Sequence, residues 1–275
     1  MVGVLRRSLV PTIVALVLAS AAAAVAQYGG PRGPFHEYPN IPYDGKFIFA
    51  RVKYGTAPGG WWYGGWPAWG HGYPLSEQNL MSIMNEVSIL APHVEDINTF
   101  TWEDPQLLKY PIAYIIEPDW WAMTDGEAAA MRRYIQKGGF VIVDDFKPMR
   151  RYGGGYDREY GVGYGTGWDV FEAHMKRVMP GAKFYTLEAT HPIFHQFFEI
   201  DDLSIVPQPY GIGGRPTFIG MFEDNDQSKR LQMVIDYNTD VSQFWEWSGT
   251  GLRPIDDTNE AYKLGVNYIV YGLTH

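Results

Sequence analysis

The sequence predicts an α/β fold, a single domain built on a mainly parallel β-sheet with helices on both faces. Three consecutive segments support this prediction. Residues 111–117 form a short, almost continuous apolar run, which is typical of a strand buried on both faces. Residues 124–139 have the pattern of an amphipathic helix, and residues 140–143 are a second buried strand. This order predicts a right-handed crossover between parallel strands.

Both ends of this central helix carry a recognisable signal. Thr124 and Glu127 have the spacing of a capping box, in which each side chain accepts a backbone N–H of the first turn. The glycine pair at 138–139 ends the helix, because glycine adopts the left-handed cap without steric cost. The second strand then runs directly into two aspartates at 144–145.

The first 26 residues have the features of a signal peptide. A basic pair at 6–7 precedes a short apolar segment at 9–18. Residues 24–26 form a small-x-small cleavage pattern, so we expect cleavage near Ala26 and a mature chain that begins at Gln27. We therefore expect an exported protein, periplasmic or extracellular. An uncleaved signal anchor is the alternative, although the apolar run is short for a membrane span.

Composition excludes several classes of function. The chain has no cysteine, which rules out a disulfide framework, a cysteine nucleophile and a thiolate metal site. Export without disulfides fits a bacterial envelope better than a eukaryotic secretory route. The formal charge is −9, and loss of the two arginines of the signal peptide makes it −11. Such an acidic chain repels phosphate backbones, so we expect no nucleic-acid partner.

The other elements complete one domain over residues 46–275, after a Gly/Pro-rich extended leader at 27–45. Apolar runs and alternating patterns predict further strands, and amphipathic patterns predict further helices. The strands are expected at 46–54, 94–100, 183–187, 217–222 and 231–236. The helices are expected at 76–90, with Ser76 as N-cap, at 168–179, and at 260–271, where apolar residues surround most of the helix.

Two loops rich in glycine and aromatic residues, 59–73 and 150–167, are expected at the carboxyl edge of the sheet. Large aromatic side chains there can form a stacking surface for sugars or a partner, or fold back as a lid, and the sequence leaves both open. Arg51, near the end of the first strand, can bind an anion or pair with a carboxylate. The candidate ligand-binding residues are Arg51, Trp61, Trp62, Trp66, Trp69, Trp120 and Trp121.

The aspartates at the end of the central strand are the sharpest candidates for chemistry. They lie at the edge where open parallel sheets bind ligands. Adjacent side chains of a strand point to opposite faces, so at most one of the two is expected in the crevice. His191, before a proline, is a candidate general base, with a turn-ordering role as the alternative. The candidate catalytic residues are Asp144, Asp145 and His191.

We predict no metal site and no cofactor. Carboxylates at 117, 119, 144–145 and 199–202 could be combined, but they show no fixed ligand spacing. His71 has no second histidine at metal spacing and is interpreted as a polar loop residue. The sequence contains neither a Gly-x-Ser-x-Gly elbow nor a His-Glu-x-x-His motif.

Several segments keep an order and spacing that indicate a family, namely 49–54, 61–63, 134–140 with the aspartates at 144–145, 191–194 and 260–267. Over about residues 46–273 the chain resembles the bacterial family called domain of unknown function 4159. The resemblance implies a class I glutamine amidotransferase-like fold, which is flavodoxin-like, an envelope association and no assigned activity. The glycine-pair strand and the His-Pro-Ile turn are also similar to the trehalose-utilisation (ThuA-like) branch. The amidotransferase branch uses a cysteine, so that reaction is excluded here.

From these features we favour a non-catalytic, exported domain that binds an envelope protein or another envelope component through its aromatic loops. One alternative is a hydrolase-like enzyme that uses the candidate catalytic residues in a crevice floored by Arg51. The other is a glycan-binding module that uses the tryptophans of residues 59–73. The enzyme hypothesis requires Arg51, one aspartate and His191 to converge within hydrogen-bond reach.

Overall fold

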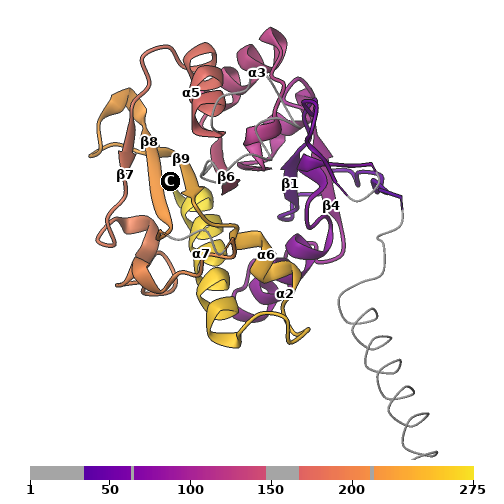
Figure 1. Ribbon diagram of the computed structural model, residues 1–275, viewed down its shortest axis with the longest axis vertical. Coiled ribbons are helices and arrows are strands. Elements are labelled where there is room, and N and C mark those ends of the chain that lie inside the picture. The colour runs from indigo at the N-terminus through magenta and orange to yellow at the C-terminus, as the bar shows by residue number, and fades with distance from the viewer. Residues whose placement is uncertain (1–33, 63–64, 147–166, 211–213) are drawn as a thin grey trace, which may run out of the picture.

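The computed structural model describes residues 34–62, 65–146, 167–210 and 214–275. Its centre is a seven-stranded sheet in the order β4–β1–β5–β6–β9–β8–β7 (Figure 1). The first five strands in this order are parallel, and β8 is antiparallel to β9. The strands are β1 (Phe49–Val52), β4 (Ile97–Phe100), β5 (Ile112–Ile116), β6 (Phe140–Phe146), β7 (Phe184–Thr186), β8 (Thr217–Phe222) and β9 (Leu231–Tyr237). The predicted α/β fold is confirmed.

Helices cover both faces of the sheet (Figure 1). One layer contains α3 (Asp125–Gln136) and α5 (Gly167–Val178), and the other contains α2 (Leu75–Val87), α6 (Val241–Glu246) and α7 (Ile255–Thr274). The strand side chains alternate between two apolar clusters. In β6, Phe140 and Ile142 pack with the α2–α6–α7 layer, and Val141 and Val143 pack with the α3–α5 layer. Burial on both faces explains why these strands are apolar throughout.

The order of the parallel strands creates a topological switch between β1 and β5. From β1 the chain passes outward to β4, then crosses to β5 on the other side of β1 and continues to β6. Counting only the five parallel strands, the order is 2-1-3-4-5, that of flavodoxin-like sheets. At such a switch the connections diverge from the carboxyl ends of neighbouring strands, which opens a crevice where ligands commonly bind.

Local signals account for some of the helix ends. Both hydrogen bonds of the predicted capping box, between Thr124 and Glu127, are present at the start of α3. α7 begins at Ile255 rather than at residue 260, with two aspartates in its first turn, where negative charge is favourable. The predicted cap at Ser76 is wrong: α2 begins one residue earlier, and the Ser76 hydroxyl donates to Glu77. α6 was not predicted.

A separate two-stranded sheet pairs β2 (Trp61–Trp62) with β3 (Trp66–Pro67). The expected signal peptide and nearly all of the expected 150–167 loop lie outside the described residues. Within the described part of the chain, no helix combines the length and the apolar character that crossing a membrane requires.

Candidate functional site

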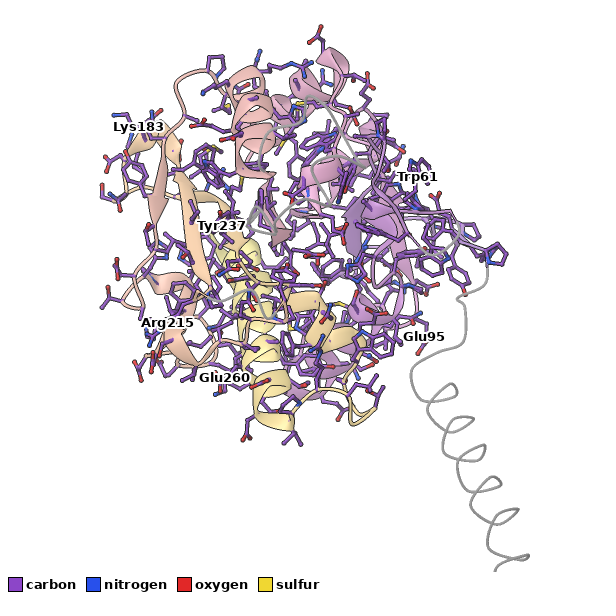
Figure 2. All side chains as sticks on the ribbon, in the orientation of Figure 1. Trp61, Glu95, Lys183, Arg215, Tyr237 and Glu260 are labelled. Atoms are coloured by element: carbon purple, nitrogen blue, oxygen red, sulfur yellow. The ribbon has the colours of Figure 1, made fainter. Side chains whose placement is uncertain are left out.

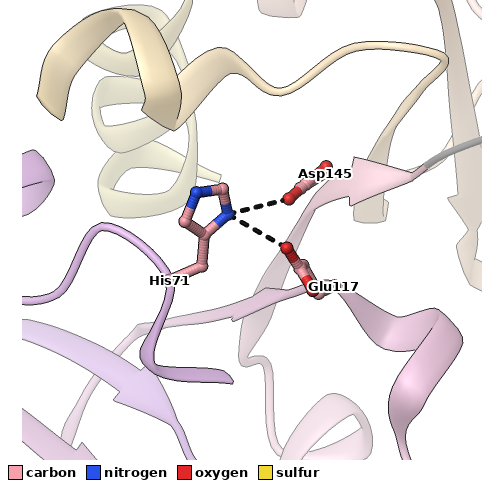
Figure 3. A group of neighbouring side chains, drawn as sticks. All are labelled: His71, Glu117 and Asp145. Carbon is pink, nitrogen blue, oxygen red and sulfur yellow. Dashed lines mark hydrogen bonds and ion pairs between the residues drawn. The ribbon is translucent and has the colours of Figure 1, made fainter. Parts of the chain in front are cut away.

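Side chains from separate loops meet at the carboxyl edge of the sheet (Figure 3). His71 lies between β3 and α2, Glu117 directly follows β5, and Asp145 lies near the end of β6. The Nδ1 atom of His71 is 3.0 Å from Oε1 of Glu117 and 3.0 Å from Oδ2 of Asp145. Asp240, the N-cap of α6, places its Oδ2 atom 3.8 Å from the same nitrogen. We call these four residues the His71 centre.

Two of these carboxylates lie on left-handed backbone. The φ angle is 48° at Glu117 and 56° at Asp145. Few residues other than glycine adopt this conformation, which costs of order 1–3 kcal/mol. At Asp145 it coincides with a register shift between Val143 and Phe146 in the pairing of β6 with β9. Such an irregularity redirects a side chain, and here Asp145 leaves the alternation of the strand and faces His71.

The centre is nearly closed to solvent, and its carboxylates are held by aromatic donors. The exposed fractions are 15% for the His71 side chain, 3% for Glu117 and 0% for Asp145. The Trp62 indole N–H donates to Oε2 of Glu117 at 2.8 Å. The Tyr210 hydroxyl donates to Oδ1 of Asp145. Each carboxylate therefore has one oxygen fixed by a donor and the other directed at His71 Nδ1.

The electrostatic surroundings favour a positive charge at this point. Burial lowers the pKa of His71, because it penalises the charged ring, but the hydrogen bonds to Asp145 and Glu117 and the nearby charge of Asp240 outweigh that effect. The pKa of His71 therefore lies well above its usual value of 6.5.

Arg51 supports the centre but does not enter it. Its buried guanidinium pairs with Glu77. It also donates to the backbone carbonyl oxygens of Trp69 and His71, each at 2.7 Å. Of the two roles considered from the sequence, the structure shows pairing with a carboxylate, in the interior rather than at an exposed strand end. Arg51 thereby fixes the loop that carries His71.

Asp144 is directed to the other side of the sheet edge. Its carboxylate accepts hydrogen bonds from the backbone N–H groups of Val241 and Ser242, at 3.0 and 2.9 Å, and from the Tyr114 hydroxyl at 2.9 Å. These bonds hold the start of α6 against β6, and burial raises the pKa of Asp144. Only one of the two aspartates belongs to the His71 centre, because the left-handed backbone at Asp145 turns its side chain away from that of Asp144.

His191 lies at the opposite edge of the sheet. Its ring packs against Tyr271, which packs on Phe140, the first residue of β6. Asp145 is five steps along that strand, about 16 Å away at ~3.3 Å per residue. Nδ1 of His191 accepts the backbone N–H of Ile193 at 3.2 Å, so the histidine orders a turn. The convergence of Arg51, one aspartate and His191 that the enzyme hypothesis from the sequence requires is therefore absent.

The tryptophan candidates do not form one open surface. Trp69 and Trp121 are buried, Trp62, Trp66 and Trp120 are half-buried, and Trp61 is 55% exposed. Trp62 packs edge to face on Trp120 with ring centroids 5.8 Å apart, so the hairpin folds back toward Glu117. This packing is closer to the lid alternative. Figure 2 shows Trp61 at the periphery of the molecule.

Sequence reasoning found only part of the His71 centre: Asp145 was selected as a catalytic candidate, and Glu117 was considered only as a metal ligand and set aside. Glu117 and Asp240 each follow a parallel strand, so the rule that selected Asp145 could also have selected them. No local signal marks His71, because Asp145 is 74 residues away along the chain. Residues far apart in the sequence can lie together in the fold, so the lack of a fixed spacing among the candidate ligands does not argue against a metal site. The ligand-type atoms of His71, Glu117 and Asp145 lie within 4.8 Å of one another, as do those of a surface trio, His195, Glu199 and Asp201.

Comparison with known proteins identifies the family to which this chain belongs. No curated protein matches the chain. The model of the family described as domain of unknown function (DUF4159) matches residues 48–273, which include the complete His71 centre. The distant likeness to amidotransferase-like and ThuA-like proteins stays a prediction. Because the match extends from the first strand into the closing helix, well over half of the sequence, this chain belongs to the DUF4159 family.

Proposed function

We propose that this chain is an exported enzyme of the hydrolase type and that the His71 centre is its active site. The observation that carries the proposal is the convergence of His71, Glu117 and Asp145 from three separate segments of the chain at the ligand-binding edge of the sheet. Removing carboxylates from water costs several kcal/mol per ion, which burial alone does not return. Ionisable groups gathered in this way are typical of sites that carry out chemistry.

The centre contains the groups that acid–base hydrolysis needs. The carboxylates beside Nδ1 orient the imidazole, as the aspartate does in hydrolytic triads. The other ring nitrogen, Nε2, points away from both carboxylates (Figure 3). That nitrogen is therefore the one placed to exchange a proton with a substrate or with the attacking water. The nucleophile in this scheme is water, and a cysteine nucleophile is excluded because the chain contains no cysteine.

The test is hydrolysis of chromogenic carboxylic esters, phosphate esters and glycosides by the full chain. We expect turnover of at least one class, and a loss of about 10²-fold or more in His71→Ala and Asp145→Asn, because proton transfer contributes factors of this size. His195→Ala is the matched control, since His195 also lies beside a carboxylate, Glu199, but on the surface. No turnover in any class, or equal turnover by His71→Ala, would overturn the proposal.

We also propose export to the periplasm or the extracellular space. The support is the basic, apolar and small-residue pattern of residues 1–26. Mass spectrometry of the protein recovered from a bacterial envelope should find Gln27 as the first residue. Recovery of residues 1–26 on the same chain would favour the anchor alternative instead.

A second candidate is binding of an envelope glycan or protein, without catalysis, through the tryptophans of the β2–β3 sheet. The observation that favours it is the exposure of Trp61, since a large exposed aromatic ring can stack on a sugar. Tryptophan fluorescence should then shift when oligosaccharides are added, and Trp61→Ala should lose the shift. A flat titration across several sugars would remove the glycan form of this candidate.

A further inference from the structure

We infer that the His71 centre binds a divalent metal ion through Nδ1 of His71, Oε1 of Glu117 and Oδ2 of Asp145. The inference rests on the proposed function in that it concerns the same centre. In this site the metal ion would take the place of the proton on Nδ1 of His71. A bound divalent ion lowers the pKa of its water, which is the chemistry that a hydrolase of this type would use.

The distances within the centre fit the coordination of a metal. Around an ion with bonds of about 2.1 Å, two ligands at the right angles of an octahedral site lie about 3.0 Å apart, and two ligands of a tetrahedral site lie about 3.4 Å apart. Both distances from His71 Nδ1, to Glu117 Oε1 and to Asp145 Oδ2, are 3.0 Å. An ion among the three atoms satisfies both carboxylates at once.

The remaining oxygens of the carboxylates provide a second, independent observation. Carboxylate ligands of metals are usually oriented by hydrogen bonds to their other oxygen. Trp62 donates to Oε2 of Glu117 at 2.8 Å, and Tyr210 donates to Oδ1 of Asp145. Both donors come from segments outside the ligand set. They leave one oxygen of each carboxylate directed into the same space as Nδ1.

Asp240 adds negative charge beside the three ligand atoms, and its Oδ2 atom accepts a hydrogen bond from the Gln243 side-chain amide at 3.2 Å. Its Oδ1 atom accepts hydrogen bonds from the Ser242 hydroxyl and the Gln243 backbone N–H, both at 2.9 Å. These bonds place Oδ2 toward the centre, 3.8 Å from Nδ1 of His71. A set of one imidazole and carboxylates suits a first-row ion such as Zn²⁺ or Mn²⁺. Ca²⁺ is disfavoured, because it takes six to eight oxygen ligands.

The test is calorimetric titration of the chelator-treated full chain with Zn²⁺ and with Mn²⁺, together with the metal content after dialysis. We expect a tight site that survives in His195→Ala, which disrupts the surface trio. Affinity should fall by about 10²-fold or more in His71→Ala and in Glu117→Gln. Trp62→Phe keeps an aromatic ring but removes the indole N–H donor, and should weaken binding by about 10- to 100-fold.

Two results would overturn the inference. One is the absence of a tight site for either ion. The other is a site that survives in folded His71→Ala and Glu117→Gln but is lost in His195→Ala, which would place the ion in the surface trio. Circular dichroism checks that each variant folds, and Trp62→Phe provides a reading if the ligand variants do not. Turnover without metal binding refutes this inference alone, and metal binding without turnover refutes the proposed hydrolase alone.

Discussion

The support that Arg51 gives to the His71 loop can be tested by separating its charge from its hydrogen bonds. Arg51 and Glu77 are both fully buried and form an ion pair. Replacing Arg51 by Met keeps most of the volume but leaves the Glu77 carboxylate buried without its partner. Loss of one member of a buried pair typically costs about 3–5 kcal/mol. We therefore expect Arg51→Met to lower the free energy of unfolding by about 4 kcal/mol.

The double variant Arg51→Met, Glu77→Leu should recover part of this loss, because no unpaired charge remains. The double variant still lacks the two hydrogen bonds that Arg51 donates, at 2.7 Å each, to the backbone carbonyl oxygens of Trp69 and His71. At about 1 kcal/mol for each lost hydrogen bond, the double variant should remain about 2 kcal/mol less stable than the wild type. The double variant also lacks the side chain that holds the His71 loop. Its hydrolysis and metal affinity should therefore stay impaired although part of the stability is recovered.

Urea unfolding followed by far-ultraviolet circular dichroism measures both values, with the slope m as a check that the denatured state is unchanged. A double variant no more stable than Arg51→Met would show that the orphaned charge does not dominate the loss. A double variant with normal activity would show that Arg51 does not position His71. Either result would refute the corresponding part of the reasoning.

Three smaller changes test other parts of the fold. Burial and the charge of His275 lower the pKa of His191 to about 4, so the unfolded chain takes up a proton first as pH falls from about 6.5 to 4. The free energy of unfolding should fall over that pH window by at most about 3 kcal/mol, and the fall should be smaller in His191→Gln. Urea unfolding midpoints measured as a function of pH test both expectations. Gly265→Ala should cost about 1–3 kcal/mol in thermal unfolding, because its Cβ would lie 2.7 Å from the Trp245 ring and 2.9 Å from Leu80. Thr124→Ala should cost about 1 kcal/mol in the same assay through loss of the α3 cap.

For each of these three substitutions, one result would contradict the expected effect. An equally steep acid limb in His191→Gln would assign the pH dependence to other groups. A higher melting temperature for Gly265→Ala would mean that helix propensity, worth about 1 kcal/mol, outweighs the crowding against two buried side chains. An unchanged Thr124→Ala would mean that the Glu127 half of the capping box is sufficient.

The fold was predictable where the signals are local. The apolar strands, the Thr124 cap and the glycine pair at 138–139 lie within one crossover unit, and each specifies its own conformation. α6 was missed because six residues give too short a pattern, and its start depends on Asp240 and on Asp144 from another strand. The antiparallel β8 was recognised as a strand, but its direction depends on its partners.

The centre was predictable only in part, for a related reason. Asp145 could be selected because the ends of parallel strands are known to gather at one edge of a sheet. His71 could not, because its role exists only through Glu117 and Asp145, and Arg51 and Trp62 hold the arrangement from still other segments. His191 was selected for a local motif, and that motif describes a turn rather than a site.

The two adjacent aspartates show how the backbone assigns different roles to identical side chains. In a regular strand Asp145 would point into the α3–α5 layer, where its neighbours Val143 and Phe146 are buried, and a carboxylate there would have no polar partner. The left-handed turn at Asp145 costs of order 1–3 kcal/mol, which is less than the burial of an unpaired charge. The turn frees the carboxylate to meet His71, while Asp144 stays in register to hold α6. The strain at the end of β6 is therefore best explained by the centre it creates.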